Sequence, residues 1–296
     1  MKLLVLTLSG KQSQYEVDRI TEESKSLGVD ISRKLYKDLS FDFRDQKVDI
    51  LVDGENLKNY SAIIFRVAGT KSGKYIFARN NIIRTMDKEG IFCLNGRSYL
   101  AWPRMEKISQ HTSFVLNQIP IIPTQVYMDK ETFPEQKMNF PLIAKYSFGF
   151  QGKSIAKIDN QDELNSFLTR RSQETFGLWL WQDCIPNQWD IRVIVVGGQT
   201  IGAMKRIAKK GDFRSNFSQG GSVENYQLSG EEKQLAEKVA KVSQLDYCGV
   251  DIIKDEAGKN YILEVNRACQ FKGFEQSTKI NVAKTLVEYL ISQGKK

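Results

Sequence analysis

The chain has a single histidine, His111, and this scarcity argues against several common catalytic centres. A Ser-His-Asp triad or a Cys-His pair needs an imidazole base, and a lone histidine in an expected helix is more often an ordinary residue. The four cysteines, Cys93, Cys184, Cys248 and Cys269, are far apart and form no C-x-x-C pair. This spacing indicates reduced, mostly buried thiols and suggests neither zinc nor a disulfide framework.

The sequence also lacks a long apolar run. No stretch approaches the roughly 20 apolar residues of a membrane span, and the apolar run at the amino terminus is too short for a signal peptide. We therefore expect a cytoplasmic protein without a membrane partner. The composition, 41% hydrophobic and 26% charged, is ordinary for a globular protein of two or three packed units.

Two nucleotide-binding glycine motifs are missing. No G-x-G-x-x-G follows the first expected strand, so a dinucleotide site is not supported there. Gly152-Lys153-Ser154 looks like the end of a Walker A loop, but Ser147 stands where that pattern needs glycine, and a β-like segment follows. The segment is then either a plain hairpin turn or a flap that covers phosphates, with Lys145 supplying a point charge.

Basic residues are in excess, and the formal net charge is +8. This charge favours acidic partners, namely phosphates, a carboxylate-rich substrate or nucleic acid. One basic cluster spans 205–214, and the only aromatic residues in it or just after it that could stack on bases are Phe213 and Phe217. Nucleic acid is therefore the weaker interpretation, although a solvated charge cluster remains an alternative to phosphate or carboxylate binding.

The order of expected elements divides the chain. Strands at 2–7, 29–35, 62–65 and 91–94 alternate with helices, which predicts a small parallel sheet within the first 95 residues or so. The remainder combines a helix at 105–118 with strands at 124–127, 141–145, 154–158, 178–182, 191–196 and 200–206, the last two joined by Gly197-Gly198. Further helices begin after Asn160 and Ser229, and one closes the chain at 280–291. This part predicts antiparallel sheet plus helices.

One hairpin, Cys248–Asn266, carries oxygen ligands in an apolar setting. A turn at Ala257-Gly258 would place Asp251 opposite Glu264, and Asn266 shares the face of Glu264 because strand side chains alternate. Two carboxylates about 4 Å apart repel by roughly 4 kcal/mol at an effective dielectric of about 20, and a cation reverses that sign. Oxygen-only donors suit Mg²⁺. The alternative is a hairpin whose polar face is simply wet.

Taken together, these segments resemble the RimK-type ATP-grasp ligases, a family that adds glutamate to a ribosomal protein or cofactor and includes amino-group-carrier ligases. The run Asp190–Gly221, with its D-I-R, V-V-G, R-x-A and G-D-F-R-S-N blocks, carries the likeness most clearly. GVDII at 249–253 and LEVN at 263–266 match the family's metal-binding strands. The resemblance is strong from about Lys145 onward and weaker before it.

The resemblance implies an α/β (α+β) ATP-grasp fold. A parallel-sheet N-terminal pre-ATP-grasp domain, 1–100, would precede two antiparallel-sheet α+β subdomains that grip ATP, a central lid at 101–182 and a C-terminal subdomain at 183–296. It also implies roles for individual residues. The metal ligands would be Asp251, Glu264 and Asn266. The nucleotide would meet Lys107, Lys145, Gln182, Asp183, Cys184, Ile185, Asp190, Arg214, Ser215 and Asn216. The reacting groups would face Arg206, Arg214 and Asn216.

The implied activity is an ATP- and Mg²⁺-dependent ligation, with Mn²⁺ as an alternative metal. A carboxylate would be activated as an acyl phosphate with release of ADP, and an amine would then form the amide. The expected partners are an amino-acid donor, glutamate favoured, and an acidic or carboxyl-terminal protein or peptide acceptor, with a homo-oligomer conceivable. The alternatives are a small-molecule ligase of a biosynthetic pathway and a non-catalytic RNA- or ribosome-binding protein. Arg267, after Asn266, departs from the family loop and is a candidate for binding an acidic acceptor.

Overall fold

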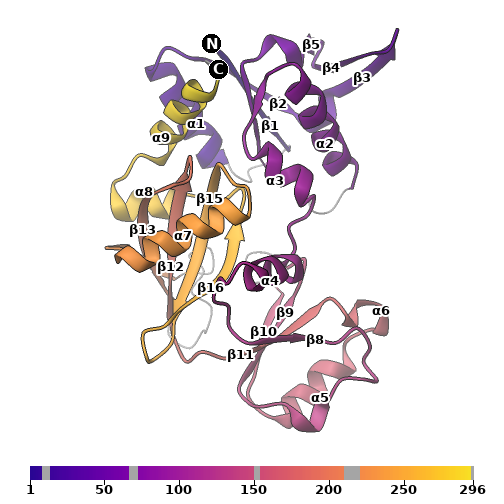
Figure 1. Cartoon of the computed structure of the whole chain (residues 1–296), viewed down its shortest axis with the longest axis vertical. Helices are drawn as coiled ribbons and strands as arrows, with labels where there is room; N and C mark the ends of the chain where they lie inside the picture. Colours follow the sequence, from indigo (N-terminus) through magenta and orange to yellow (C-terminus); the bar gives the residue numbers. More distant parts are fainter. Residues whose placement is uncertain (9–13, 67–72, 150–153, 210–220, 295–296) are drawn as a thin grey trace.

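The computed structural model describes residues 1–8, 14–66, 73–149, 154–209 and 221–294 (Figure 1). In the view of Figure 1 the N-terminal part lies at the top, the C-terminal sheet at mid-height and the lid sheet at the bottom. Among the described helices none is both long and apolar enough to cross a membrane. The fold therefore consists of three sheet-centred parts along one chain.

The N-terminal part is built on a parallel sheet, as the alternating pattern predicts. Its strands, in sheet order, are β2 (Asp30–Leu35), β1 (Lys2–Thr7), β6 (Ala62–Phe65) and β7 (Phe92–Cys93). Its helices are α1 (Gln14–Ser26), α2 (Gly73–Lys88) and α3 (Gly96–Ala101). β6 and nearly all of β1 are buried, which explains why both are continuous apolar runs without polar alternation.

A second, antiparallel sheet in this part was not expected from the sequence. It contains β3 (Leu39–Arg44), β4 (Lys47–Val52) and β5 (Glu55–Asn56), flanked by the 3₁₀ turns η1 (Tyr36–Asp38) and η2 (Leu57–Asn59). The signal was present, because Leu39, Phe41 and Phe43 alternate with polar residues. Asp45 and Gln46 both adopt positive φ, the conformation of a tight hairpin turn.

The C-terminal part holds the longest strands. The sheet order is β14 (Ser222–Tyr226), β13 (Gln199–Ile207), β12 (Trp189–Val196), β15 (Tyr247–Lys254) and β16 (Asn260–Asn266), all antiparallel. Its helices are α7 (Gly230–Val242), α8 (Lys272–Thr278) and α9 (Val282–Gln293). Gly197 and Gly198 form the two-residue turn between β12 and β13 with φ of 59° and 81°, which confirms the tight hairpin.

The lid sheet is also antiparallel, in the order β10 (Ile155–Ile158), β9 (Leu142–Tyr146), β11 (Trp179–Asp183) and β8 (Thr124–Val126). α5 (Gln161–Thr169), α6 (Gln173–Phe176) and the 3₁₀ turn η3 (Glu135–Lys137) complete it. The side chain of Asn160 caps α5 by accepting from the backbone of Glu163, as expected. Aromatic side chains make up much of its core, and the ring centres of Phe133 and Trp181 lie 4.4 Å apart.

α4 (Lys107–Leu116) follows the N-terminal part and contacts β16 and α7. Its first backbone N–H donates to the carbonyl of Ser147, just beyond β9, over 3.3 Å. The helix therefore touches both antiparallel sheets, and Figure 1 shows it between them. A parallel sheet first and antiparallel sheets afterwards confirm the mixed α/β class expected from the sequence.

Candidate ATP and magnesium site

The hairpin β15–β16 brings the expected metal ligands together. Asp251 pairs directly with Glu264, and Asn266 donates from Nδ2 to Glu264 Oε1 over 3.0 Å. Asp251 is buried, and the Glu264 side chain is 30% exposed. The predicted register is therefore present where the carboxylates lie.

The turn of this hairpin differs from the expected two-residue tip. The backbone N–H of Asp255 donates to the carbonyl of Lys259, so the turn is longer, with Gly258 at φ 82°. The register then shifts by one between Asp251 and Ile252, which makes Leu263 an extra residue in β16. The longer turn and the bulge offset each other, and Asp251 still faces Glu264.

Four charged side chains alternate in sign across β13, β12 and β15. Asp190 lies opposite Arg206, which bonds it through Nε to Oδ1 at 2.5 Å and through Nη2 to Oδ2 at 2.8 Å. Arg206 also reaches Asp251 Oδ2 at 3.0 Å. Asp251 in turn accepts a bidentate pair of bonds from Arg192, which lies opposite it on β12. Bidentate bonds hold these buried carboxylates in fixed orientations.

Arg192 was not among the residues expected at the site. It lies two residues after Asp190 and so faces the same side of β12, and this alternation could have identified it. A Cβ atom on Gly249 would lie only 2.8 Å from Arg192 Cδ. Glycine at that position therefore leaves room for the arginine to reach Asp251.

Lys107 joins Glu264 to the segment after β9. Its Nζ lies 3.4 Å from Glu264 Oε2 and donates to the carbonyl of Gly149 over 2.7 Å. Burial alone would raise the pKa of Glu264, but the charge of Lys107, the bond from Asn266 and nearby cations lower it to about 2. Glu264 is therefore ionised at every physiological pH and can bind a cation.

Lys145 is buried at the end of β9, within electrostatic reach of Glu264, Asp190 and Asp251. Burial lowers its pKa to about 8, and Lys107 adds to that effect, while the three carboxylates oppose it. A buried ammonium with such a pKa is only marginally stabilised in the unliganded chain. An incoming phosphate would favour its charged form.

His111 lies on α4 and is 7% exposed. Its Nδ1 has no hydrogen-bond partner among the described residues, and burial together with the charges of Lys145 and Lys107 lowers its pKa to about 4. The imidazole is therefore neutral at pH 7. It lies beside the expected phosphate-binding lysines, where it avoids adding a further positive charge.

The segment expected to hold the adenine joins the lid to the C-terminal sheet. Gln182 is buried and donates to Thr124 Oγ1 over 2.9 Å, whereas Asp183 is exposed. Cys184 and Ile185 are half-buried. Arg214, Ser215 and Asn216 lie outside the described residues, as do Gly152 and Lys153 of the expected flap.

The charge balance of this site suits an anionic ligand. The four cations are Lys107, Lys145, Arg192 and Arg206, and the three carboxylates are Asp190, Asp251 and Glu264. One positive charge is therefore in excess before any ligand binds.

The donor set suits magnesium. In the parts of the chain that are described, no three Asp, Glu, His or Cys side chains gather as a metal site. The expected ligands are instead two carboxylates and the amide oxygen of Asn266, the hard oxygen donors that Mg²⁺ prefers. Each carboxylate oxygen has two lone pairs, so Asp251 can keep its arginine bonds and still offer an oxygen.

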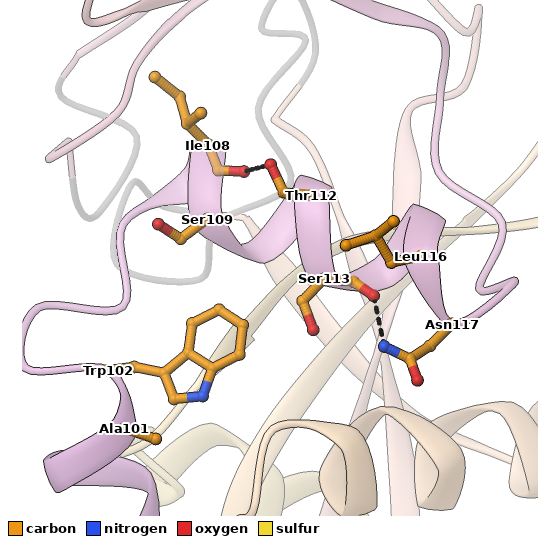
Figure 2. A pocket seen from close by; sticks show the side chains of 8 residues that line it. All are labelled: Ala101, Trp102, Ile108, Ser109, Thr112, Ser113, Leu116 and Asn117. Atoms are coloured by element: carbon orange, nitrogen blue, oxygen red, sulfur yellow. Dashed lines mark hydrogen bonds between the residues drawn. The ribbon is translucent and has the colours of Figure 1, made fainter.

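A separate hollow of about 490 Å³ opens beside α4 and the end of α3 (Figure 2). Its lining residues are Ala101, Trp102, Ile108, Ser109, Thr112, Ser113, Leu116 and Asn117. None of them titrates, and two of the polar groups bond to carbonyls of their own helix, Thr112 to Ile108 and Asn117 to Ser113. The hollow lacks the charged groups of the site above, so we place no chemistry there.

Comparison with known proteins identifies the family of both halves of the chain. Residues 1–98 match the model of the RimK pre-ATP-grasp domain, and residues 107–290 match the RimK-like ATP-grasp domain. A probable alpha-L-glutamate ligase of Maridesulfovibrio salexigens is 27% identical over 289 residues, covering 96% of this chain and 93% of that protein. One from Pseudoalteromonas atlantica is 29% identical over 302 residues, covering 100% and 97%.

Solved structures share the fold. The ATP-grasp ligase PsnB, in complex with a phosphomimetic variant of a minimal precursor, Mg and ADP, superposes with a TM-score of 0.78 at 19% identity, covering 99% of this chain and 98% of that one. The macrocyclase MdnC of Microcystis aeruginosa, bound to its precursor peptide, gives 0.73 at 16% identity, covering 99% and 100%. With both family domains matched in order along the chain, the protein belongs to the RimK-like ATP-grasp family.

Proposed function

We propose that this protein is an ADP-forming carboxylate–amine ligase that joins an amino acid, with glutamate favoured, to the carboxyl terminus of a protein or peptide. The observation that carries the proposal is the facing pair Asp251 and Glu264, set among four buried or half-buried cations in a RimK-like chain. Curated relatives named as probable glutamate ligases support the choice of glutamate.

The reaction proceeds in two balanced steps. An oxygen of the substrate carboxylate attacks the γ-phosphorus of ATP, the bond to the β-phosphate oxygen breaks, and an acyl phosphate and ADP result. The amine nitrogen then attacks the acyl carbon, inorganic phosphate leaves, and the nitrogen loses a proton as the amide forms. Both steps need charge neutralisation and alignment more than a protein nucleophile, which agrees with a single histidine held neutral.

Each described residue then has a defined task. Asp251, Glu264 and Asn266 would hold Mg²⁺, which neutralises phosphate charge when bound. Lys145 and Lys107 would bind phosphate oxygens from the lid side. Arg206 and Arg192 fix the orientation of Asp251, and the segment after Gln182 would line the adenine.

A second acceptor class has specific support. The superposed ligases PsnB and MdnC were solved with precursor peptides, and the fold of this chain matches theirs over almost its whole length. The acceptor can therefore be a peptide whose side-chain carboxylate is activated, in which case the amine comes from the same peptide. The two acceptor classes share the first step and differ in the source of the amine.

The decisive assay is ADP release with ATP, Mg²⁺, glutamate and candidate acceptors. Asp251→Asn and Glu264→Gln should each reduce turnover by about a hundredfold or more, because each removes charge that holds the metal. Glu256→Gln, in the exposed turn of the same hairpin, is the matched control and should keep full turnover. Unchanged turnover in both site variants would refute the metal assignment.

The acceptor is identified by mass spectrometry. Lysate proteins and peptides are incubated with enzyme, ATP and isotopically labelled glutamate, and mass additions are mapped. A label on carboxyl termini supports the first acceptor class. A peptide that loses the mass of water and carries no label supports the second acceptor class. If neither change occurs and no ADP is released, ligation is refuted.

A further inference from the structure

One aromatic ring of the N-terminal part lies against two guanidinium groups, one from each terminal part of the chain. Arg79 of α2 has its Cζ 3.9 Å from the ring centre of Tyr99, and Arg267, just after β16, has its Cζ 4.4 Å from the same centre. We call these three residues the tyrosine clamp. Two cations on one ring bring like charges together, which requires a compensating group.

Main-chain carbonyls compensate only in part. Arg79 Nη2 donates to Pro103 O over 2.8 Å, and Arg267 Nη2 donates to the same oxygen over 3.3 Å. Arg267 Nη1 also bonds the carbonyls of Ser98 and Trp102, at the end of α3. Because they share an acceptor, the two Nη2 nitrogens lie within about 6 Å of each other.

No carboxylate neutralises the tyrosine clamp. Over the ranges that the structure describes, neither arginine forms an ion pair. Arg79 is 4% exposed, and its Nε has no hydrogen-bond partner among those residues. Glu106 is within electrostatic reach of Arg267 but forms no ion pair with it. Buried cations without counter-ions are costly, and such sites commonly receive an anion.

The tyrosine clamp is also close in sequence to the expected reaction centre. Arg267 directly follows Asn266, one of the expected metal ligands, and its bond from Nη2 to Pro103 is open to solvent. Glu106, within electrostatic reach of Arg267, precedes Lys107, whose Nζ lies 3.4 Å from Glu264 Oε2, so the tyrosine clamp and the expected metal site both lie beside the start of α4. Guanidinium groups present paired donors that match the geometry of a carboxylate.

We infer that the tyrosine clamp binds a carboxylate of an acidic substrate, namely one that the reaction leaves unmodified. This inference deepens the proposed function, because it makes the substrate a dicarboxylate or an acidic peptide residue. It also revises the expectation for Arg267, which acts together with Arg79 and caps α3 as well.

The first test measures binding of glutarate, a dicarboxylate, and of its monoamide to the full chain by calorimetry. The unmodified protein should prefer glutarate by about tenfold or more, because the monoamide lacks one charge. Arg79→Lys and Arg267→Lys should each reduce that preference to about twofold, since lysine cannot form paired bonds. Arg97→Gln, which changes an exposed arginine on α3, is the matched control and should keep it.

A second test needs no variant and so is independent of folding. Phenylglyoxal modification of Arg267, mapped by mass spectrometry, should be slowed by about tenfold by saturating glutarate and unaffected by the monoamide. Modification of Arg97 should not respond to either compound. Equal binding of both compounds, or lysine variants that keep the preference, would overturn the inference.

Failure of the inference and failure of the proposed function give different results. Glutarate binding that depends on Arg79 and Arg267, without ADP release from any acceptor, refutes ligation and leaves the carboxylate site intact. ADP release with normal turnover in the lysine variants supports ligation and refutes the site.

Discussion

The N- and C-terminal parts have one hydrophobic core in common, beside a further core centred on each, whereas the core of the lid is separate. The shared core includes Leu3 and Val5 of β1, Ile194 of β12 and Leu286 of α9, residues from both ends of the chain. The buried lid core contains only residues between Phe133 and Trp181. The terminal parts are therefore expected to unfold together, and the lid can open or unfold without disrupting them.

Polar bonds strengthen the same contrast. Asn95, in the left-handed conformation at φ 59°, accepts from the backbone of Asp246 and Tyr247 and donates to the carbonyls of Tyr247 and Arg267. Its own backbone N–H donates to Asp246 Oδ2 over 2.7 Å. One buried amide thus joins the first sheet to the strands of the proposed metal site, and no described residue of the lid takes part in these bonds.

The largest expected effect is on this junction. Asn95→Ala would leave buried backbone donors and acceptors on three residues without partners, at about 1–3 kcal/mol each. We expect a loss of about 4 kcal/mol in the free energy of unfolding, measured by urea denaturation. Asn165→Ala, on exposed α5, should change it by less than about 0.5 kcal/mol. A small effect at Asn95 would mean that the other contacts between the terminal parts, such as the bond from Phe271 N to Glu16, hold them together without this amide.

A core substitution in the lid should act locally. Phe176 is fully buried and packs 5.5 Å from Phe133 and 5.9 Å from Trp181, so Phe176→Ala should cost about 3 kcal/mol. Hydrogen exchange should then show lost protection in β8 to β11 while β1 and β12 stay protected. Leu286→Ala in the shared core should instead weaken β1 and β12 together. If Phe176→Ala reduced protection throughout the chain, the lid would not be independent of the core that the terminal parts share.

Acid should destabilise the fold through His111. The folded pKa of His111, about 4, is below the ordinary value of about 6.5, so the unfolded chain binds a proton between these values. Stability therefore falls as pH drops from about 6.5 to 4, by about 3 kcal/mol from this residue. His111→Gln should remove that part of the pH dependence in urea denaturation at pH 7 and 4. A parallel profile in both proteins would contradict the assignment.

The smallest effect concerns ATP binding through Lys145. Its pKa of about 8 means that the ammonium loses its proton above that pH in the free enzyme. The KM for ATP should therefore rise about fivefold between pH 7.5 and 9, as charge is lost from the phosphate site. Lys145→Arg keeps its charge over this range and should give a flat profile. A flat profile in the unmodified enzyme would place Lys145 away from the phosphates.

Much of the fold could be predicted because its signals are local. The bounds of β1 and β6, the turn at Gly197-Gly198 and the helix cap at Asn160 follow from burial runs and turn chemistry. The sheet β3–β5 was missed although its alternation is visible, because its strands are short and surround polar turns. The division into 1–100, 101–182 and 183–296 stays a prediction, and the shared core shows why packing does not follow chain segments.

The expected metal ligands could be predicted from the sequence, whereas the ion pairs that surround them could be predicted only in part. The alternation of Asp190 with Arg192 lies in the sequence, but the bond from Arg206 to both Asp190 and Asp251 depends on three strands meeting in one register. The tyrosine clamp joins α2, α3 and the end of β16, so no local pattern indicates it. Side-chain roles that depend on distant segments are not visible in spacing alone.

The bulge at Leu263 has a practical consequence for protein engineering. Deleting Leu263 would join the pairs Ile252–Ile262 and Asp251–Glu264 into one regular ladder, so Glu264 should still lie opposite Asp251 while the local bend of β16 is lost. Metal affinity that survives this deletion would mean that the facing carboxylates are sufficient. Lost affinity would mean that the site also needs the bend.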